Sequence, residues 1–207
     1  KFISDVNQIE KCINKKTVAI MLPNLLGNIC DWKKVYKIAK KNNLVVIEDS
    51  ADTLGAKLNG KYSGSYTDIS ITSFYGSHII NGAGNGGMVC FNDKELYEKA
   101  LLLRSWGRSS SLFREDSEKI ENRFNINIDG IPYDKKFVFE SLGYNFEPSE
   151  ISAAFANVQL KKLNKNLSIR IKNFKQHLKF FREQDRYFET PIEIKSARTG
   201  WLAFPII

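Results

Sequence analysis

An acidic run in the first quarter of the chain has the residue types that bind cofactors. The run is Glu48-Asp49-Ser50-Ala51-Asp52, and it directly follows the apolar residues 44–47. Ligands of open α/β sheets bind outside the carboxyl ends of the strands, so a carboxylate at this place can meet a cofactor. A helix cap or an ordinary loop acid explains such a carboxylate about equally well.

His78 is the second candidate for chemistry. It follows Ser73 by five residues and stands just before a glycine-rich loop. An imidazole exchanges protons near neutral pH, so a histidine beside a serine and a glycine turn suits general acid or base catalysis. A lone histidine is nevertheless more often a structural or surface residue, and the other histidine, His177, lies in a long basic segment.

The glycine-rich loop at residues 82–87 formally matches the dinucleotide-binding pattern G-x-G-x-x-G. That pattern must open a helix, whereas residues 88–91 predict a strand. We therefore reject a dinucleotide site. The glycines are expected to form a tight turn that lets the backbone approach a ligand closely.

The elements expected to position these residues begin with a strand–helix–strand unit. Residues 17–21 predict a strand, Asp31 is expected to cap a helix over 32–42, and residues 44–47 predict a strand buried on both faces. This order is typical of an α/β fold with a parallel sheet. The sequence further predicts a hairpin turn at Asn59-Gly60, strands over 68–74 and 87–91, and a helix to about 104 that Asn92-Asp93 caps.

The second half of the chain predicts an irregular segment followed by helices. Residues 109–148 lack a periodic pattern, and loops of this length are usually functional or form small β elements. One helix is expected from Ile151 to about 163 and a second to about 184. Their amphipathic stripe consists of Leu160, Leu163, Leu167, Ile171, Phe174, Leu178 and Phe181. The apolar run 201–207 predicts a strand and, with the missing initial Met, indicates a piece of a longer protein.

Composition excludes several classes of protein. The 207 residues are 43% apolar and 12% aromatic, which excludes a mainly disordered chain. No apolar run approaches the ~18 residues of a membrane helix, so no membrane partner is expected. The scattered Cys12, Cys30 and Cys90 suit neither a disulfide framework nor a zinc site, and they favour a reduced, cytoplasmic setting.

The net charge of +8 is concentrated in one segment. Residues 161–186 hold nine Lys or Arg residues against Glu183 and Asp185, a net charge of +7. A nucleic-acid-binding patch has such a charge, but so does the solvated face of an amphipathic helix. We favour the solvated face and expect no nucleic-acid partner, because no aromatic side chain interleaves with the charges to stack on bases.

Six motifs in a fixed order carry a resemblance to a known family. They are Glu48-Asp49-Ser50-Ala51-Asp52, residues 72–78, residues 84–89, Arg104-Ser105-Trp106-Gly107-Arg108, residues 142–146, and Ala153-Ala154 with residues 159–163. In these motifs the sequence resembles the DegT family of pyridoxal-phosphate sugar enzymes, which have the aspartate-aminotransferase fold (fold type I). The resemblance implies an α/β cofactor-binding large domain over residues 1–163, lacking its N-terminal part. Residues 164–207 would be a connecting helix and the start of a truncated small C-terminal domain.

One position departs from the aminotransferases of the family. They carry a lysine five residues after the serine, where it attaches to the cofactor, and this sequence has His78 there. A histidine at this position resembles the 3-dehydratase branch, whose members remove the C3 hydroxyl of nucleotide-linked 4-keto-6-deoxy sugars. The resemblance thus implies a dehydratase of lipopolysaccharide or O-antigen deoxysugar biosynthesis, using pyridoxal 5′-phosphate or pyridoxamine 5′-phosphate, with His78 moving the protons. A sugar aminotransferase and a non-catalytic dimerising scaffold are the alternatives.

The resemblance also assigns roles to other residues. Asp49 would pair with the pyridinium nitrogen, Ala51 would pack against the ring face, and Asp52 would lie near the ring hydroxyl. Ser73 would hydrogen-bond the phosphate. Asn145 would reach the cofactor phosphate of a partner subunit, which implies a homodimer.

Two types of dehydratase exist in this branch. The CDP-sugar type holds an iron–sulfur cluster with cysteines just after the Trp-Gly-Arg motif, where this sequence reads Ser109-Ser110-Ser111. The stretches 122–125 and 133–137 also resemble the GDP-sugar type, which needs no cluster and acts on GDP-4-keto-6-deoxy-D-mannose. The implied partners are therefore a GDP-linked 4-keto-6-deoxy sugar and L-glutamate as the amino donor, with no metal.

Overall fold

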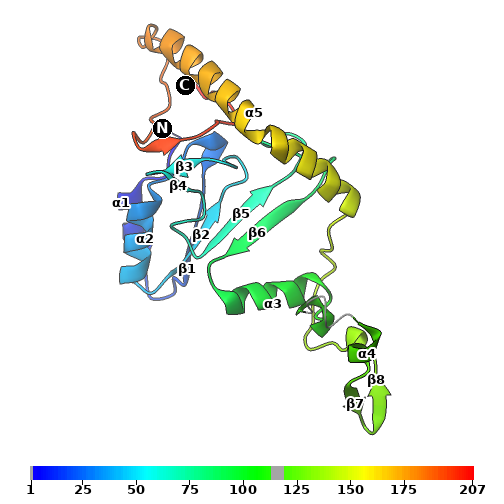
Figure 1. The fold of residues 1–207 in the computed structure, drawn as a ribbon. Coiled ribbons are helices and arrows are strands. Elements are labelled where there is room, and N and C mark those ends of the chain that lie inside the picture. Colours follow the sequence, from blue (N-terminus) through cyan, green and yellow to red (C-terminus); the bar gives the residue numbers. More distant parts are fainter. Residues whose placement is uncertain (1, 113–118) are drawn as a thin grey trace. The chain divides into compact units, whose positions relative to one another are not determined.

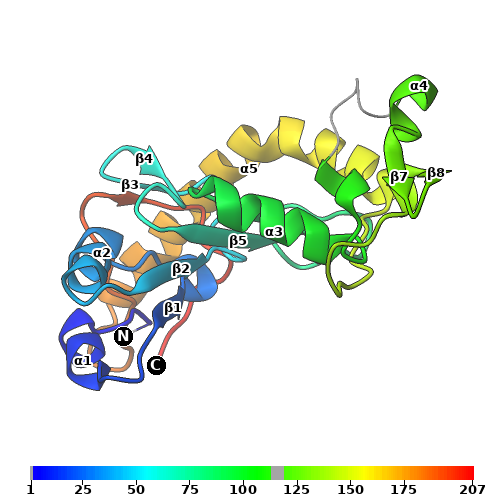
Figure 2. The same cartoon turned by 90° about the horizontal axis from the view of Figure 1, so that it is seen from below.

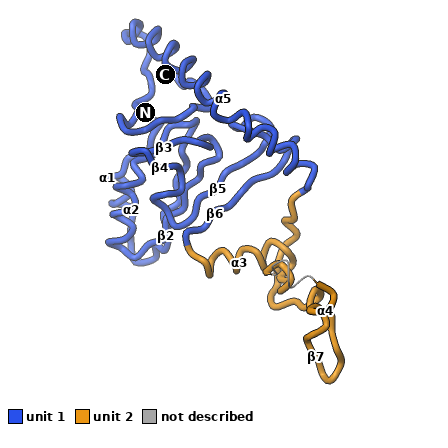
Figure 3. The backbone as a smooth tube through the Cα atoms, in the orientation of Figure 1, with its two compact units in different colours: residues 1–92, 149–207 blue, residues 93–148 orange. Residues whose placement is uncertain are grey.

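The computed structural model describes residues 2–112 and 119–207, which form two compact units (Figures 1 and 3). The first unit comprises Lys1–Asn92 and Ser149–Ile207, and the second comprises Asp93–Pro148. The domain boundary expected after residue 163 falls within a helix of the first unit and stays a prediction.

A four-stranded sheet forms the centre of the first unit. Its strands are β1 (Ala19–Pro23), β2 (Val45–Asp49), β5 (Ile69–Ser73) and β6 (Gly87–Phe91), in the order β1-β2-β5-β6. β1, β2 and β5 run parallel, and β6 is antiparallel to β5. The predicted strand–helix–strand unit with parallel strands is therefore confirmed.

Helix α2 (Trp32–Lys41) connects β1 to β2 and packs against β2, with α1 (Val6–Cys12) beside it (Figure 2). Asp31 caps α2 as predicted, because its carboxylate accepts a hydrogen bond from the Lys34 N–H. Val35 and Ala39 of α2 share a core with Val46 of β2, and all three are fully buried. This apolar core anchors β2, the strand that ends in the acidic run.

The prediction that β2 is buried on both faces is wrong. Val46 is 0% exposed, whereas Val45, on the opposite face, is 37% exposed. Helix α2 covers the face of Val46, and the described residues cover the other face less completely. The continuous apolar run therefore indicated a strand correctly but did not report how many faces are covered.

A small antiparallel sheet flanks the acidic run. It consists of β4 (Lys61–Tyr62), β3 (Lys57–Leu58) and β9 (Ala197–Arg198), in that order. Asn59 and Gly60 have φ angles of 50° and 78°, so both central turn residues are left-handed. A two-residue hairpin with this geometry is the turn that the Asn-Gly pair predicts.

A single helix, α5 (Glu150–Arg182), replaces the two helices that were expected. The Ser149 side chain caps it by accepting a hydrogen bond from the Ser152 N–H. No glycine or proline interrupts its 33 residues and the apolar stripe runs through residue 163, so nothing there breaks the helix. Its buried residues are Leu167, Phe174 and Leu178, while most of its Lys and Arg side chains are exposed, as a solvated face requires.

The strand predicted over residues 201–207 is absent, and this described segment is irregular. Trp201 is 3% exposed and stacks on Phe174 of α5, with ring centroids 4.2 Å apart. Phe204 contacts the same ring at 5.1 Å. Packing on α5 therefore explains the two aromatic residues of the segment, whereas Ile206 and Ile207 are exposed.

The second unit opens with α3 (Lys94–Arg104), capped by Asp93 as predicted. The irregular segment that follows holds small elements, as expected, and residues 113–118 of it lie outside the described residues. These elements are η2 (Ser109–Leu112), α4 (Ile120–Arg123), a hairpin of β7 (Ile126–Ile128) and β8 (Ile131–Tyr133), and η4 (Lys135–Phe137). Across both described ranges, no helix is long and apolar enough to cross a membrane.

Candidate active site

The sheet brings two of the predicted site residues to one edge. Asp49 is the last residue of β2 and Ser73 is the last residue of β5, its parallel neighbour. Because parallel strands end at the same edge, the carboxylate and the hydroxyl lie on that edge together. Asp49 accepts a hydrogen bond from the Ala51 N–H at 3.1 Å, and Ser73 Oγ accepts one from the Tyr75 N–H at 3.2 Å.

A second carboxylate faces the histidine. Asp52 Oδ1 lies 3.7 Å from His78 Nε2, and the two side chains are 19% and 20% exposed. The other oxygen, Asp52 Oδ2, accepts a hydrogen bond of 2.9 Å from the backbone N–H of Leu26. One carboxylate therefore lies between a backbone donor and the imidazole, an arrangement that suits the orientation of an acid/base histidine.

The other nitrogen of His78 is unusual. Nδ1 is buried and has no hydrogen-bond partner among the described residues. Buried polar atoms are nearly always paired, so an unpaired one at the edge of a sheet indicates a missing partner such as a ligand. The Tyr75 ring lies edge-on to the imidazole at 5.9 Å and is itself largely exposed.

The glycine-rich loop forms the tight turn that the sequence predicts. Gly84 and Gly86 have φ angles of 111° and 133°, and β6 follows directly. The Phe74 N–H donates to the Gly86 carbonyl and the Phe74 carbonyl accepts from the Gly82 N–H, both at 2.8 Å. The loop thus fixes the backbone of Phe74, which directly follows Ser73.

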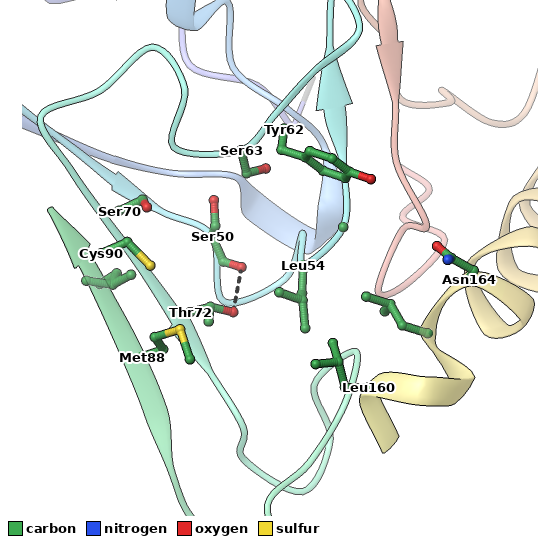
Figure 4. Close-up of a pocket in the computed structure, with 13 residues that line it drawn as sticks. Ser50, Leu54, Tyr62, Ser63, Ser70, Thr72, Met88, Cys90, Leu160 and Asn164 are labelled. Atoms are coloured by element: carbon green, nitrogen blue, oxygen red, sulfur yellow. Dashed lines mark hydrogen bonds between the residues drawn. The ribbon is translucent and has the colours of Figure 1, made fainter. Parts of the chain in front are cut away.

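A cavity of about 470 Å³ lies between the sheet and α5, and Figure 4 shows its lining. Hydroxyl, sulfur and apolar groups line it, among them Ser70 and Thr72 of β5 and Met88 and Cys90 of β6. Thr72 Oγ1 donates to the Ser50 carbonyl at 3.3 Å. None of the predicted site residues lines this cavity.

Asn145 lies in the second unit. It is exposed and pairs with Ser105 in an isolated antiparallel bridge. The other predicted site residues, Asp49, Ala51, Asp52, Ser73 and His78, all belong to the first unit. The role of Asn145 toward a partner subunit stays a prediction.

Sequence reasoning missed Leu26 and Asn24. Leu26 contributes only its backbone N–H, and Asn24 is a buried amide whose contacts lie 6 to 29 residues away in sequence. The left-handed φ of 56° at Leu26 is a property of the fold that the leucine does not signal. No sequence pattern points to either residue.

The chemistry of these groups fits pyridoxal phosphate. A carboxylate such as Asp49 suits a protonated ring nitrogen, and a strand-end hydroxyl such as Ser73 suits a phosphate. The Ala51 methyl group offers an apolar contact to a ring, and His78 Nδ1 lacks the partner that a ligand would supply. Together with the α/β sheet, they are compatible with a pyridoxal-phosphate site in the aminotransferase-like fold.

The chain belongs to the DegT/DnrJ/EryC1/StrS aminotransferase family, whose model matches residues 1–207. It is 32% identical over 204 residues to GDP-4-keto-6-deoxy-D-mannose 3-dehydratase of Yersinia pseudotuberculosis, covering 98% of this chain and 49% of that protein. It is 34% identical over 163 residues to GDP-perosamine synthase of Escherichia coli O157:H7, covering 79% and 38%.

Solved structures agree with the fold. The E. coli GDP-4-keto-6-deoxy-D-mannose 3-dehydratase with bound hydrated PLP superimposes with a TM-score of 0.80 at 26% identity, covering 98% of this chain and 50% of that chain. The chain thus spans about half the length of the proteins it matches. These relatives are thus two GDP-4-keto-6-deoxy-D-mannose 3-dehydratases, one of them with bound hydrated PLP, and a GDP-perosamine synthase.

Proposed function

We propose that the protein is a 3-dehydratase that uses pyridoxal or pyridoxamine phosphate and removes the C3 hydroxyl of a GDP-linked 4-keto-6-deoxyhexose. The observation that carries this proposal is His78, five residues after the strand-end Ser73 and facing Asp52 at 3.7 Å. An imidazole cannot hold the cofactor as a lysine amine does, but it transfers protons near neutral pH. The sugar product fits a lipopolysaccharide or O-antigen pathway in the cytoplasm.

The predicted site residues of the first unit have separate roles in the proposed reaction. The cofactor, when bound, supplies an electron sink for the loss of the C3 hydroxyl. His78 takes up a proton as base and returns one to the departing hydroxyl as acid through Nδ1, the ring nitrogen that does not face Asp52. Asp52, fixed by the Leu26 N–H, orients the imidazole. Asp49 keeps the ring nitrogen protonated, which strengthens the electron sink, and Ser73 donates to the phosphate.

Further partners follow from the same proposal. L-glutamate would restore the amine of the cofactor after each turnover. Two copies of the protein would form a homodimer in which each Asn145 hydrogen-bonds the phosphate held by the other copy. The exposed position of Asn145 is compatible with such a role.

An aminotransferase is the second candidate, and the 34% identity to a GDP-perosamine synthase favours it. An aminotransferase needs a lysine amine beside the cofactor ring. If the full-length protein shows absorbance from covalently attached cofactor and the replacement of one lysine abolishes it, the aminotransferase interpretation holds and the dehydratase proposal is wrong.

The direct test is His78→Asn in the full-length protein, with pyridoxamine phosphate, L-glutamate and candidate GDP-linked 4-keto sugars. Loss of a general acid/base should lower kcat by about 10²- to 10⁴-fold, with the C3 deoxygenated product identified by mass spectrometry. His177→Asn is the matched control, because this exposed histidine of α5 lies outside the site and should leave kcat unchanged. Unchanged turnover in His78→Asn would refute the dehydratase proposal.

A further inference from the structure

A buried polar cluster lies directly behind the acidic run. It consists of Asn24, Glu48, Ser50 and Thr53, of which Ser50 is 4% exposed and the others 1% exposed. Polar groups are costly to bury without hydrogen bonds, so a cluster of this size is stable only when its members satisfy one another. Three of its members flank Asp49 and Asp52 along the chain.

Asn24 is the hub of this cluster. Its Nδ2 donates to Glu48 Oε1 at 2.8 Å, Ser50 Oγ at 3.1 Å and Thr53 Oγ1 at 3.2 Å. Its backbone N–H donates to the Asp49 carbonyl at 2.9 Å. One residue thus contacts the 48–53 loop on both sides of the two site carboxylates.

The oxygen of the same amide binds residues of the core. Asn24 Oδ1 accepts from Trp32 Nε1 at 2.9 Å and from the Cys30 N–H at 3.0 Å. Trp32 is 2% exposed and begins α2, so it is fixed in the core. The amide therefore joins a rigid helix start to the loop that carries the site.

Asn24 also begins the segment that reaches Asp52. Leu26 follows it in a left-handed conformation and donates its N–H to Asp52 Oδ2. The carbonyl groups of this segment are bound as well. The Leu202 N–H donates to the Leu26 carbonyl at 3.0 Å, and Thr199 Oγ1 donates to the Gly27 carbonyl at 2.6 Å. The Leu26 donor thus lies two residues after Asn24, and its acceptor Asp52 directly precedes Thr53, which the Asn24 amide binds.

We propose that Asn24 is a positioning residue that holds the Asp49 and Asp52 carboxylates in the positions that a pyridoxal-type cofactor requires. Its Nδ2 donates hydrogen bonds to side chains within residues 48–53, which carry both carboxylates. It also begins the segment in which the Leu26 N–H binds Asp52. This inference rests on the proposed function, because it concerns the same two carboxylates. Asn24 itself touches neither His78 nor a reacting atom, so its effect passes through Asp49 and Asp52.

The test is Asn24→Asp in the full-length protein. This change keeps the shape of the side chain and an acceptor for Trp32 and Cys30, but it removes the donor that binds the loop. The measurements are the dissociation constant of pyridoxamine phosphate and the pH at which the absorption spectrum of the bound cofactor changes. We expect roughly tenfold weaker binding and a displaced spectral midpoint, since hydrogen bonds to charged groups are lost.

Trp32→Phe is the matched control, because it removes a hydrogen bond to the oxygen of the same amide. It should lower the melting temperature yet leave the dissociation constant within about twofold and the spectral midpoint unchanged. If both variants change the cofactor measurements alike, or neither changes them, Asn24 is only structural and the inference is wrong. If Asn24→Asp does not fold, Thr53→Val takes its place, and about threefold weaker binding is expected from the loss of one acceptor.

Asp49→Asn separates the two proposals. If it leaves affinity and spectrum unchanged, the assignment of the site itself fails. If it changes both while Asn24→Asp and Thr53→Val change neither, only the positioning role of Asn24 fails.

Discussion

We expect the aromatic stack between α5 and the C-terminal segment to make a measurable contribution to stability. Phe174 is 5% exposed and Trp201 is 3% exposed, and their rings lie 4.2 Å apart with an interplanar angle of 10°. Truncation of a buried phenylalanine to alanine costs about 3–5 kcal/mol, of which about 0.5–1.5 kcal/mol reflects a stacked aromatic pair. The stack belongs to a small cluster with Leu178 and Phe204, so we expect Phe174→Ala to cost about 3 kcal/mol, the lower end of that range.

Urea denaturation of the full-length protein measures this cost. The midpoint should fall in Phe174→Ala while the slope stays constant, so that the change reports stability alone. Phe180→Ala is the matched control on the same helix, because Phe180 is 58% exposed and should lose about 1 kcal/mol or less. If Phe174→Ala loses less than about 1 kcal/mol, or no more than Phe180→Ala, the stack does not stabilise the fold and the reasoning is wrong.

Two predictions concern titrating groups. Burial raises the pKa of the Cys30 thiol, so at pH 8 thiol reagents should label the exposed Cys12 well before Cys30, and equal labelling rates would contradict the buried position. The Arg123 guanidinium, which hydrogen-bonds Asp134, lowers the pKa of that carboxyl below 3.8. The pair therefore stabilises the fold at neutral pH and loses this contribution as pH falls below about 3.8. Carboxyl NMR titration should show the lowered pKa, and Arg123→Gln should bring it back toward 3.8.

Local patterns predicted most of the first unit. The structure contains the predicted strands before residue 92, the Asp31 cap and the Asn59-Gly60 turn, and in the second unit the Asp93 cap, each of which has a short-range signal in the sequence. The errors concern burial and continuity instead. The burial of the second face of β2 depends on which elements pack against that face. The conformation of residues 201–207 likewise depends on their tertiary neighbours, and local periodicity encodes neither.

The sequence by itself determined the family, the order of the elements and the chemical types at the site, including a histidine in place of the expected lysine. These are properties of residue identity and spacing along the chain. Only the tertiary structure decided that Asp52 faces His78 and is held by the Leu26 N–H, because that donor lies 26 residues away and requires a left-handed backbone. The Asn24 cluster likewise exists only once β1, α2 and β2 pack together, since burial is what gives its hydrogen bonds their strength.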